Sequence, residues 1–196
     1  LLDVDQVIRA SEVLREMIAS SGEYPAMQFL QAGDLMLKHE QPEEAILAYK
    51  QARSRMQQGD ADKDVAQMDQ RALFGMGKAY HAAGKAEDSV RMINTLIDTH
   101  PTTGFFYDAR FLLADIHRDQ GQPAEAIVVL KDIFKRASDP AVINRATIAL
   151  AHLQIAENRP KDALASTQRI VLLADPSDPV VRPFFEEALY LGVKLQ

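Results

Sequence analysis

The chain has 196 residues and contains no cysteine. That absence excludes disulfide bonds, thiolate metal ligands and cysteine nucleophiles, and it leaves the compartment open. Glycine and proline are also scarce, with 9 of each, and most of the prolines stand at regular breaks. No apolar run approaches the ~20 residues that span a bilayer, and no signal-peptide pattern is present, so we expect no direct membrane insertion.

Basic residues are outnumbered by acidic ones. Lysine and arginine total 22, aspartate and glutamate 28, and the formal net charge is −6. Nucleic-acid binders usually present a basic face, so nucleic acid is not an expected partner. Alanine, leucine, glutamine and charged residues dominate and are good helix formers, whereas no stretch alternates as a strand would. The composition therefore favours an all-α protein.

One segment carries a pattern that recurs along the chain. It places a bulky residue at Leu73, a small residue four positions later at Gly77, and an aromatic residue at Tyr80. Gly84 supplies a turn, and Pro101 closes the unit. This order predicts a pair of antiparallel helices joined by a tight turn.

The same frame is filled in three further segments. Small residues recur where the two helices of a pair would cross, because only small side chains let two backbones approach closely. In the first helix of successive units they are Gly33, Gly77, Ala114 and Ala151. In the second helix they are Ala45, Ser89, Ala126 and Ala163, spaced by 44, 37 and 37 residues.

This frame resembles the tetratricopeptide repeat, whose period is about 34 residues. The resemblance implies an all-α, right-handed α–α superhelix of about ten antiparallel helices, as a single solenoid over residues 1–196. Its expected units are a half-repeat over 4–20, repeats over about 25–58, 66–101, 106–139 and 143–176, and a closing helix over 180–195. The longer first interval predicts an insertion at residues 57–62.

The first unit has the pattern of a second helix without its first. Ala10, Leu14 and Met17 fit the second-helix frame. Two interpretations have equal weight: the parent protein continues upstream of Leu1, or residues 4–20 form a capping helix. Because the chain begins with leucine, we expect it to be part of a longer or processed protein.

A second resemblance concerns the end of one repeat. His100 and Pro101, followed by Phe106 and Tyr107, are similar to the longer repeat variant of bacterial envelope proteins. Examples are the outer-membrane assembly lipoproteins and the periplasmic coordinator of the Tol-Pal system. This resemblance implies the periplasm or cell envelope, with the cytoplasm as the alternative.

In tetratricopeptide proteins the first helix of each pair lines a concave groove, and the resemblance implies a partner-binding surface there. The expected groove residues flank the packed ones on the opposite helical face. They are Leu30, Asp34, Arg71, Phe74, Lys78, His81, Phe111, Asp115, Arg118, Arg145, Ile148 and His152.

Four of these residues are apolar and occupy equivalent positions. Leu30, Phe74, Phe111 and Ile148 would form a stripe suited to an extended peptide or an amphipathic helix. The alternative is that they pack between helix pairs, which is the more frequent outcome for an apolar residue at helical spacing. The carboxylate clamp of some family members needs lysine and asparagine where this chain has Leu30 and Asp34, so that role is not expected.

Residues in catalytic or metal-binding patterns are not apparent. The five histidines form no i, i+4 pair, and His117 falls at a packing position. Acidic pairs such as Glu43 and Glu44 stand near expected helix starts, where they suit the helix dipole. No glycine-rich phosphate loop and no serine nucleophile elbow occur. The sequence predicts a protein that is not an enzyme and carries no metal or cofactor.

Two functions follow from this pattern. The leading hypothesis is a non-catalytic scaffold that binds a peptide or protein partner in the groove, in a bacterial envelope assembly. The alternative is an assembly or regulatory solenoid domain of a longer multidomain protein, such as an enzyme or a secretion component. The sequence leaves the partner and the oligomeric state open.

Overall fold

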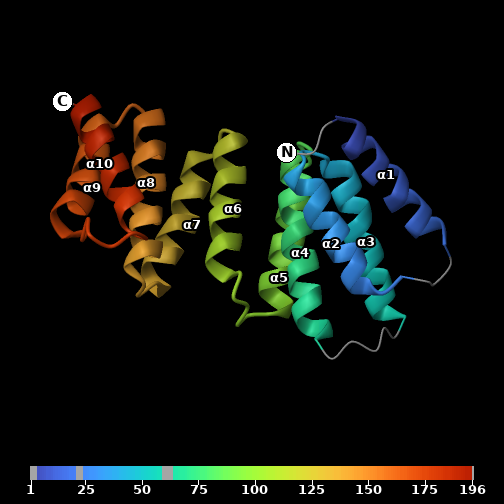
Figure 1. Ribbon diagram of the computed structural model, residues 1–196. Coiled ribbons are helices and arrows are strands. Elements are labelled where there is room, and N and C mark those ends of the chain that lie inside the picture. The colour runs from blue at the N-terminus through green and yellow to red at the C-terminus, as the bar shows by residue number, and fades with distance from the viewer. Residues whose placement is uncertain (1–3, 21–23, 59–63, 196) are drawn as a thin grey trace. The chain divides into compact units, whose positions relative to one another are not determined.

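The computed structural model describes residues 4–20, 24–58 and 64–195, and these ranges contain α-helices and no strand (Figure 1). The prediction of an all-α chain with about ten helices is therefore confirmed for the described residues. The helices are α1 (Val4–Ala19), α2 (Ala26–Lys38), α3 (Pro42–Gln57), α4 (Val65–Ala82), α5 (Ala86–Thr99), α6 (Phe106–Asp119), α7 (Pro123–Arg136), α8 (Pro140–Ala156), α9 (Pro160–Leu173) and α10 (Arg182–Lys194).

The chain forms two compact units, Leu1–Ala109 and Arg110–Gln196, with the boundary inside α6. The predicted repeat boundaries within one solenoid stay a prediction. The expected insertion at residues 57–62 begins at Gln57, the last residue of α3, and its residues 59–62 are outside the described part of the chain.

Four turns between helices close in the same way. In each, a residue with positive φ follows the first helix: Glu40, Gly84, Gly121 and Asn158, at φ 58°, 72°, 70° and 58°. The next amide then donates a hydrogen bond to the carbonyl five residues earlier, as Lys85 does to Tyr80 over 2.8 Å. This Schellman closure satisfies carbonyls that the helix end leaves unpaired. It brings the second helix back along the first.

Proline marks the start of several helices. Pro42, Pro123, Pro140 and Pro160 are the first residues of α3, α7, α8 and α9. Proline lacks an amide hydrogen, and the first helical turn does not need one. Of these four starts, only that of α8 has a side-chain cap, in which the Asp139 carboxylate accepts from the amide of Ala141 over 2.8 Å.

The core of the first unit is built around Tyr49, whose residue is 1% exposed. The Tyr49 ring lies against Gly33 of α2 and Gly75 of α4, so closely that a Cβ at either glycine would approach it within 3.0 Å. On the next pair, the buried Ser89 hydroxyl donates to the carbonyl of Gly77 over 2.6 Å. Small residues thus sit where the sequence frame places the helix crossings.

The core of the second unit follows the same frame. Ala126, Ala151 and Ala163 are fully buried. Near the end of the unit, Ile148 of α8 and Ile170 of α9 pack with Ala188 and Leu191 of α10. This packing fixes the first helices α8 and α10 on the side of α9 that carries its apolar stripe.

Candidate protein-interaction site

In the first unit, two predicted groove residues form an ion pair between first helices. The Arg71 guanidinium donates to the Asp34 carboxylate, through Nε over 2.9 Å and also through a terminal nitrogen. The hydroxyl of Tyr49 donates to the other carboxylate oxygen over 2.6 Å. Both oxygens of Asp34 are therefore engaged, although the Asp34 and Arg71 side chains remain 41% and 40% exposed.

The environment of Tyr49 favours the protonated phenol. Burial raises the pKa of Tyr49 well above its ordinary value, and the hydrogen bond to Asp34 and the charge of that carboxylate raise it further. The positive charge of Arg71 opposes the shift without reversing it. Tyr49 therefore remains a hydrogen-bond donor at neutral pH and holds Asp34 in place.

Beside this pair, α4 presents an aromatic and cationic surface. Phe74 stacks on Phe105, with ring centroids 4.9 Å apart and an interplanar angle of 22°. The exposed ammonium of Lys78 lies 5.7 Å from the Phe74 ring centroid, and His81 is half-buried one turn further on. Phe105 was not among the sequence-predicted residues, because it precedes α6 and falls outside the helical frame.

Three of the expected groove residues are buried, which corrects their predicted exposure. Leu30 is 0% exposed, Phe111 4% and Ile148 6%. Leu30 belongs to the core that contains Phe29 and Tyr49, and Ile148 belongs to the core at α9 and α10. A first helix inside a helical array packs on several neighbours, so its buried arc is wider than that of a single surface helix. These three side chains are therefore packing residues, as the alternative interpretation of the apolar stripe expected.

In the second unit, the remaining predicted residues occupy separate local contacts. The Arg145 guanidinium lies over the Phe111 ring, with its Cζ atom 3.9 Å from the ring centroid. Arg118 donates to Asp115 over 2.7 Å, and Nε2 of His152 lies 2.7 Å from Glu187 of α10. The Arg118, Arg145 and His152 residues are exposed, so their side chains are available at the surface.

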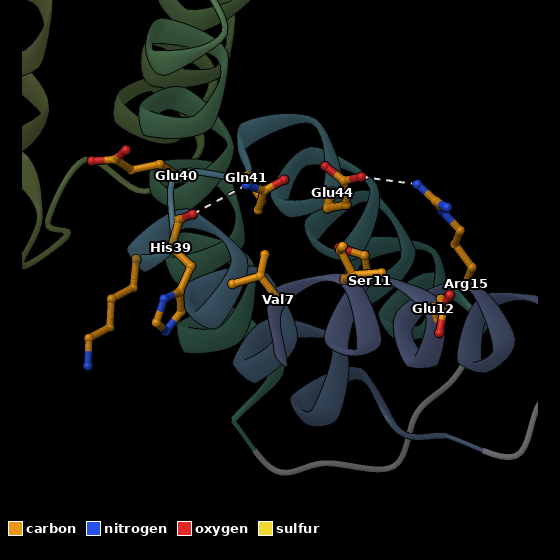
Figure 2. A pocket seen from close by; sticks show the side chains of 10 residues that line it. Val7, Ser11, Glu12, Arg15, His39, Glu40, Gln41 and Glu44 are labelled. Carbon is orange, nitrogen blue, oxygen red and sulfur yellow. Dashed lines mark hydrogen bonds and ion pairs between the residues drawn. The ribbon is translucent and has the colours of Figure 1, made fainter. Parts of the chain in front are cut away.

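A pocket of about 700 Å³ opens between α1 and the turn that joins α2 to α3 (Figure 2). Val7, Ile8 and Ser11 of α1 form one wall, and the rim carries charges of both signs. Arg15 donates to Glu44 over 3.1 Å across this rim, as the dashed line in Figure 2 shows.

Sequence analysis did not predict this pocket, although the sequence contains one residue that could have pointed to it. Glu40, which lines it, adopts positive φ where the other turns have Gly84, Gly121 and Asn158. Such a conformation is unfavourable for a residue with a Cβ atom, and glycine or asparagine is the usual occupant. A glutamate at this turn position is therefore a recognisable departure from the repeat frame.

An apolar groove of about 440 Å³ lies between α9 and α10. Leu172 and Val193, which line it, are 81% and 75% exposed. The floor includes Gly192, where an added Cβ would meet only the hydroxyl of Thr167 at 3.8 Å. Leu189 of α10, which also lines the groove, is 42% exposed.

The described residues offer no arrangement for metal binding, since no group of three or more histidine, aspartate or glutamate side chains converges among them. In the same ranges, no helix is long and apolar enough to cross a membrane. The surfaces above provide ion pairs, stacked rings and apolar hollows. Such features can contact a polypeptide.

Comparisons with known proteins agree with the helical pairing. A family model described as a tetratricopeptide repeat-like domain matches residues 72–171, just over half of the chain. No curated protein sequence matches the chain significantly.

Several solved structures share the fold. A tetratricopeptide repeat protein from Parabacteroides merdae aligns with a TM-score of 0.55 and 13% identity, over 95% of this chain and 66% of that chain. The C-terminal part of a TPR repeat-containing protein from Cytophaga hutchinsonii aligns with a TM-score of 0.62 and 12% identity, over 96% of this chain and 75% of that chain. YrrB, described as a TPR protein with an unusual peptide-binding site, aligns with a TM-score of 0.55 and 14% identity, over 95% of this chain and 93% of that chain. At these identities the likeness concerns the fold alone.

Proposed function

Because this chain belongs to the tetratricopeptide repeat-like family, we propose that it is a non-catalytic scaffold whose first helices bind a protein or peptide partner. Folds of this type generally mediate protein–protein interaction and are typically not catalytic. YrrB, which shares the fold, is described as having a peptide-binding site. A place in a bacterial envelope assembly is the setting we propose, on the resemblance of residues 96–110 to the envelope variant.

The observation that carries this proposal is the surface formed by Phe74, Phe105 and Lys78. Two stacked rings, each half-buried, sit beside an exposed ammonium on the first helix α4. An aromatic side chain with one accessible face can gain apolar contact with a partner at little entropic cost. Arg71 lies on α4 as well and, with its partner Asp34 of α2, adds a charged edge to this surface.

In the second unit, exposed charges on first helices support the same role. Arg145 covers Phe111, and Arg118 pairs with Asp115. These charged groups can exchange their present contacts for contacts with a partner. We propose that each unit contributes its own first-helix residues to binding, and Leu30, Phe111 and Ile148 support those residues from the core.

Site-specific photo-crosslinking tests the proposal. A photoreactive amino acid is placed at position 78 of α4 or, as a matched control, at position 50 of α3. Lys50 and Lys78 are both exposed, and their ammonium groups lie 5.6 Å and 5.7 Å from the ring centroids of Tyr80 and Phe74. The two positions therefore differ mainly in that position 78 lies on a first helix and position 50 on a second helix.

We expect partner crosslinks from position 78 and few from position 50. The variant Phe74→Ala/Lys78→Glu should lose at least about tenfold in partner affinity, which corresponds to 1.4 kcal/mol. Its circular dichroism and melting temperature report whether the fold is intact. Equal crosslinking from both positions, or unchanged affinity of a folded variant, would contradict the proposal that the first helices bind the partner.

A second candidate function is assembly within a longer multidomain protein, and the apolar surface of α9 and α10 favours it. Exposed side chains such as Leu172 and Val193 are usually covered when they gather on one face. Hydrogen exchange of residues 164–193 can be compared between this chain and the protein made from its complete reading frame. Greater protection in the longer protein is expected, and equal protection would contradict this candidate.

A further inference from the structure

A second surface lies on α7, which is a second helix and carries none of the predicted groove residues. Its outer face contains Val128, Lys131, Asp132 and Lys135, spaced so that they fall on one side of the helix. With Arg110 of α6 and Val129, these residues line a pocket of about 460 Å³.

The charges of this pocket are unbalanced. Asp132 is the carboxylate of the lining, and it is paired twice: Arg110 approaches one oxygen at 3.3 Å and Arg136 the other at 3.1 Å. Lys131 and Lys135 are exposed, and in the described part of the chain neither has an ion-pair partner. We call Arg110, Lys131, Asp132, Lys135 and Arg136 the α7 basic patch.

The patch stands out against the rest of the molecule. It gathers four cationic side chains and one carboxylate in a chain whose formal net charge is −6. Like charges placed together on an exposed helix face repel one another, which lowers the stability of that helix slightly. An anionic partner would remove this repulsion and gain from both free lysines.

The pocket also has an apolar component. Val128 is 66% exposed and Val129 is half-buried beside it. These valines and the lysines are within two helical turns of one another, so one ligand can contact both kinds of group. A purely ionic ligand would use the lysines and leave the exposed valine unused.

We propose that the α7 basic patch binds an acidic segment of a protein partner, in which carboxylates flank an apolar side chain. The carboxylates would pair with Lys131 and Lys135, and the apolar side chain would cover Val128. Nucleic acids and anionic membranes are poorer candidates, because both present extended negative charge to a chain that is acidic overall. This inference does not depend on the proposed groove, since none of its residues, on α7 or at Arg110 of α6, is among the predicted groove residues.

The probe is a synthetic peptide of about twelve residues, built of glutamates with a leucine at every fourth position. It is titrated into isotopically labelled protein, and amide chemical shifts are followed by NMR. We expect the largest shifts at Arg110 and at residues 128–136. We also expect the affinity to fall as salt rises from about 50 to about 300 mM, because exposed charges are screened.

Two double variants separate the patch from general charge. Lys131→Glu/Lys135→Glu should weaken binding at least about tenfold, which corresponds to 1.4 kcal/mol. Lys161→Glu/Arg169→Glu makes the same change in net charge on α9, where both side chains are exposed, and should alter affinity less than about twofold. Val128→Ser should weaken binding without changing its salt dependence.

Four outcomes would overturn the inference. The first is unchanged binding by a folded Lys131→Glu/Lys135→Glu variant. The second is equal binding of a peptide in which glutamine replaces every glutamate. The third is a set of shifts confined to first-helix residues such as Phe74 and Lys78, which would favour the proposed groove instead. The fourth is binding of phosphatidylglycerol vesicles without binding of the peptide, which would indicate a membrane surface.

Discussion

The Tyr49 hydroxyl donates a hydrogen bond to the Asp34 carboxylate over 2.6 Å, from a ring that lies between two glycines. One side chain of α3 thereby fixes both neighbouring first helices, α2 through Gly33 and Asp34 and α4 through Gly75. Asp34 in turn accepts a hydrogen bond from Arg71 of α4. The charged edge of the proposed binding surface is consequently positioned by a core residue of the second helix.

Removing the Tyr49 hydroxyl should lower the stability of the protein. Tyr49→Phe keeps the buried ring but leaves one Asp34 oxygen without its donor, and we expect a loss of about 1 kcal/mol in the free energy of unfolding. Urea denaturation followed by circular dichroism measures it. The matched control is Tyr80→Phe, a buried tyrosine whose hydroxyl has no hydrogen bond in the described residues. A control loss as large as that of Tyr49→Phe would contradict the assigned hydrogen bond.

Stability should also fall at alkaline pH through Tyr49. The pKa of Tyr49 is raised in the folded protein, first by burial and then by Asp34. Above the ordinary tyrosine pKa of about 10, the unfolded chain releases this proton and the folded chain keeps it. The contribution is therefore fully present below about pH 10 and is lost as pH rises, by up to about 1.4 kcal/mol per pH unit.

This pH effect is separated from other titrations by Tyr49→Phe. Unfolding free energies of both proteins are measured from about pH 8 to about pH 12. The decline should be steeper in the parent protein than in Tyr49→Phe. Parallel curves would show that Tyr49 titrates alike in the folded and unfolded states.

Gly75→Ala should destabilise the first unit. The new Cβ would lie within 3.0 Å of the Tyr49 ring, and overpacking of this kind costs about 1–3 kcal/mol. In a Tyr49→Ala background the same substitution should cost much less, because contacting residues are not additive. Thermal denaturation of the single and double variants checks this coupling, and additive losses would argue against the contact.

Gly192→Ala is the matched substitution in a helix with space around it. Its Cβ would have one neighbour, the Thr167 hydroxyl at 3.8 Å. Alanine has the higher helix propensity, so we expect a gain of up to about 1 kcal/mol. A loss of stability would mean that α10 needs its glycine for a reason other than space.

Glu40→Gly should stabilise the turn between α2 and α3. Glu40 has φ 58°, a left-handed conformation that disfavours a side chain by about 1–2 kcal/mol. Part of this gain is offset by the greater freedom of glycine in the unfolded chain, which leaves up to about 1 kcal/mol. Gly84→Ala, at φ 72°, makes the reverse change and should destabilise the protein in the same urea assay.

The helix crossings were predictable from the sequence. Ala45, Ala126 and Ala163 stand at the expected small positions and are fully buried, as is Ser89. Gly33 and Gly77 mark first helices in the same frame. Close approach of two backbones restricts residue size at a few fixed spacings, and such a restriction is visible in one sequence.

The exposure of the groove residues was less predictable. Leu30, Phe111 and Ile148 share one frame position with Phe74, yet these three are buried and Phe74 is half-buried. Helical periodicity gives the direction of a side chain, but the neighbouring helices decide how much of that direction is covered. Phe74 is covered in part by Phe105, which stacks on it from outside the frame, while Lys78 lies beside the ring.

The sequence by itself determined the helices, their turns and the positions of the small residues, because these depend on local propensity and on spacings of three and four. The tertiary structure alone decided which charges meet. The partners Arg71 and Asp34 are 37 residues apart, and Arg110 of α6 meets Asp132 of α7. Such contacts depend on how helices are placed against one another, and no local pattern records that placement.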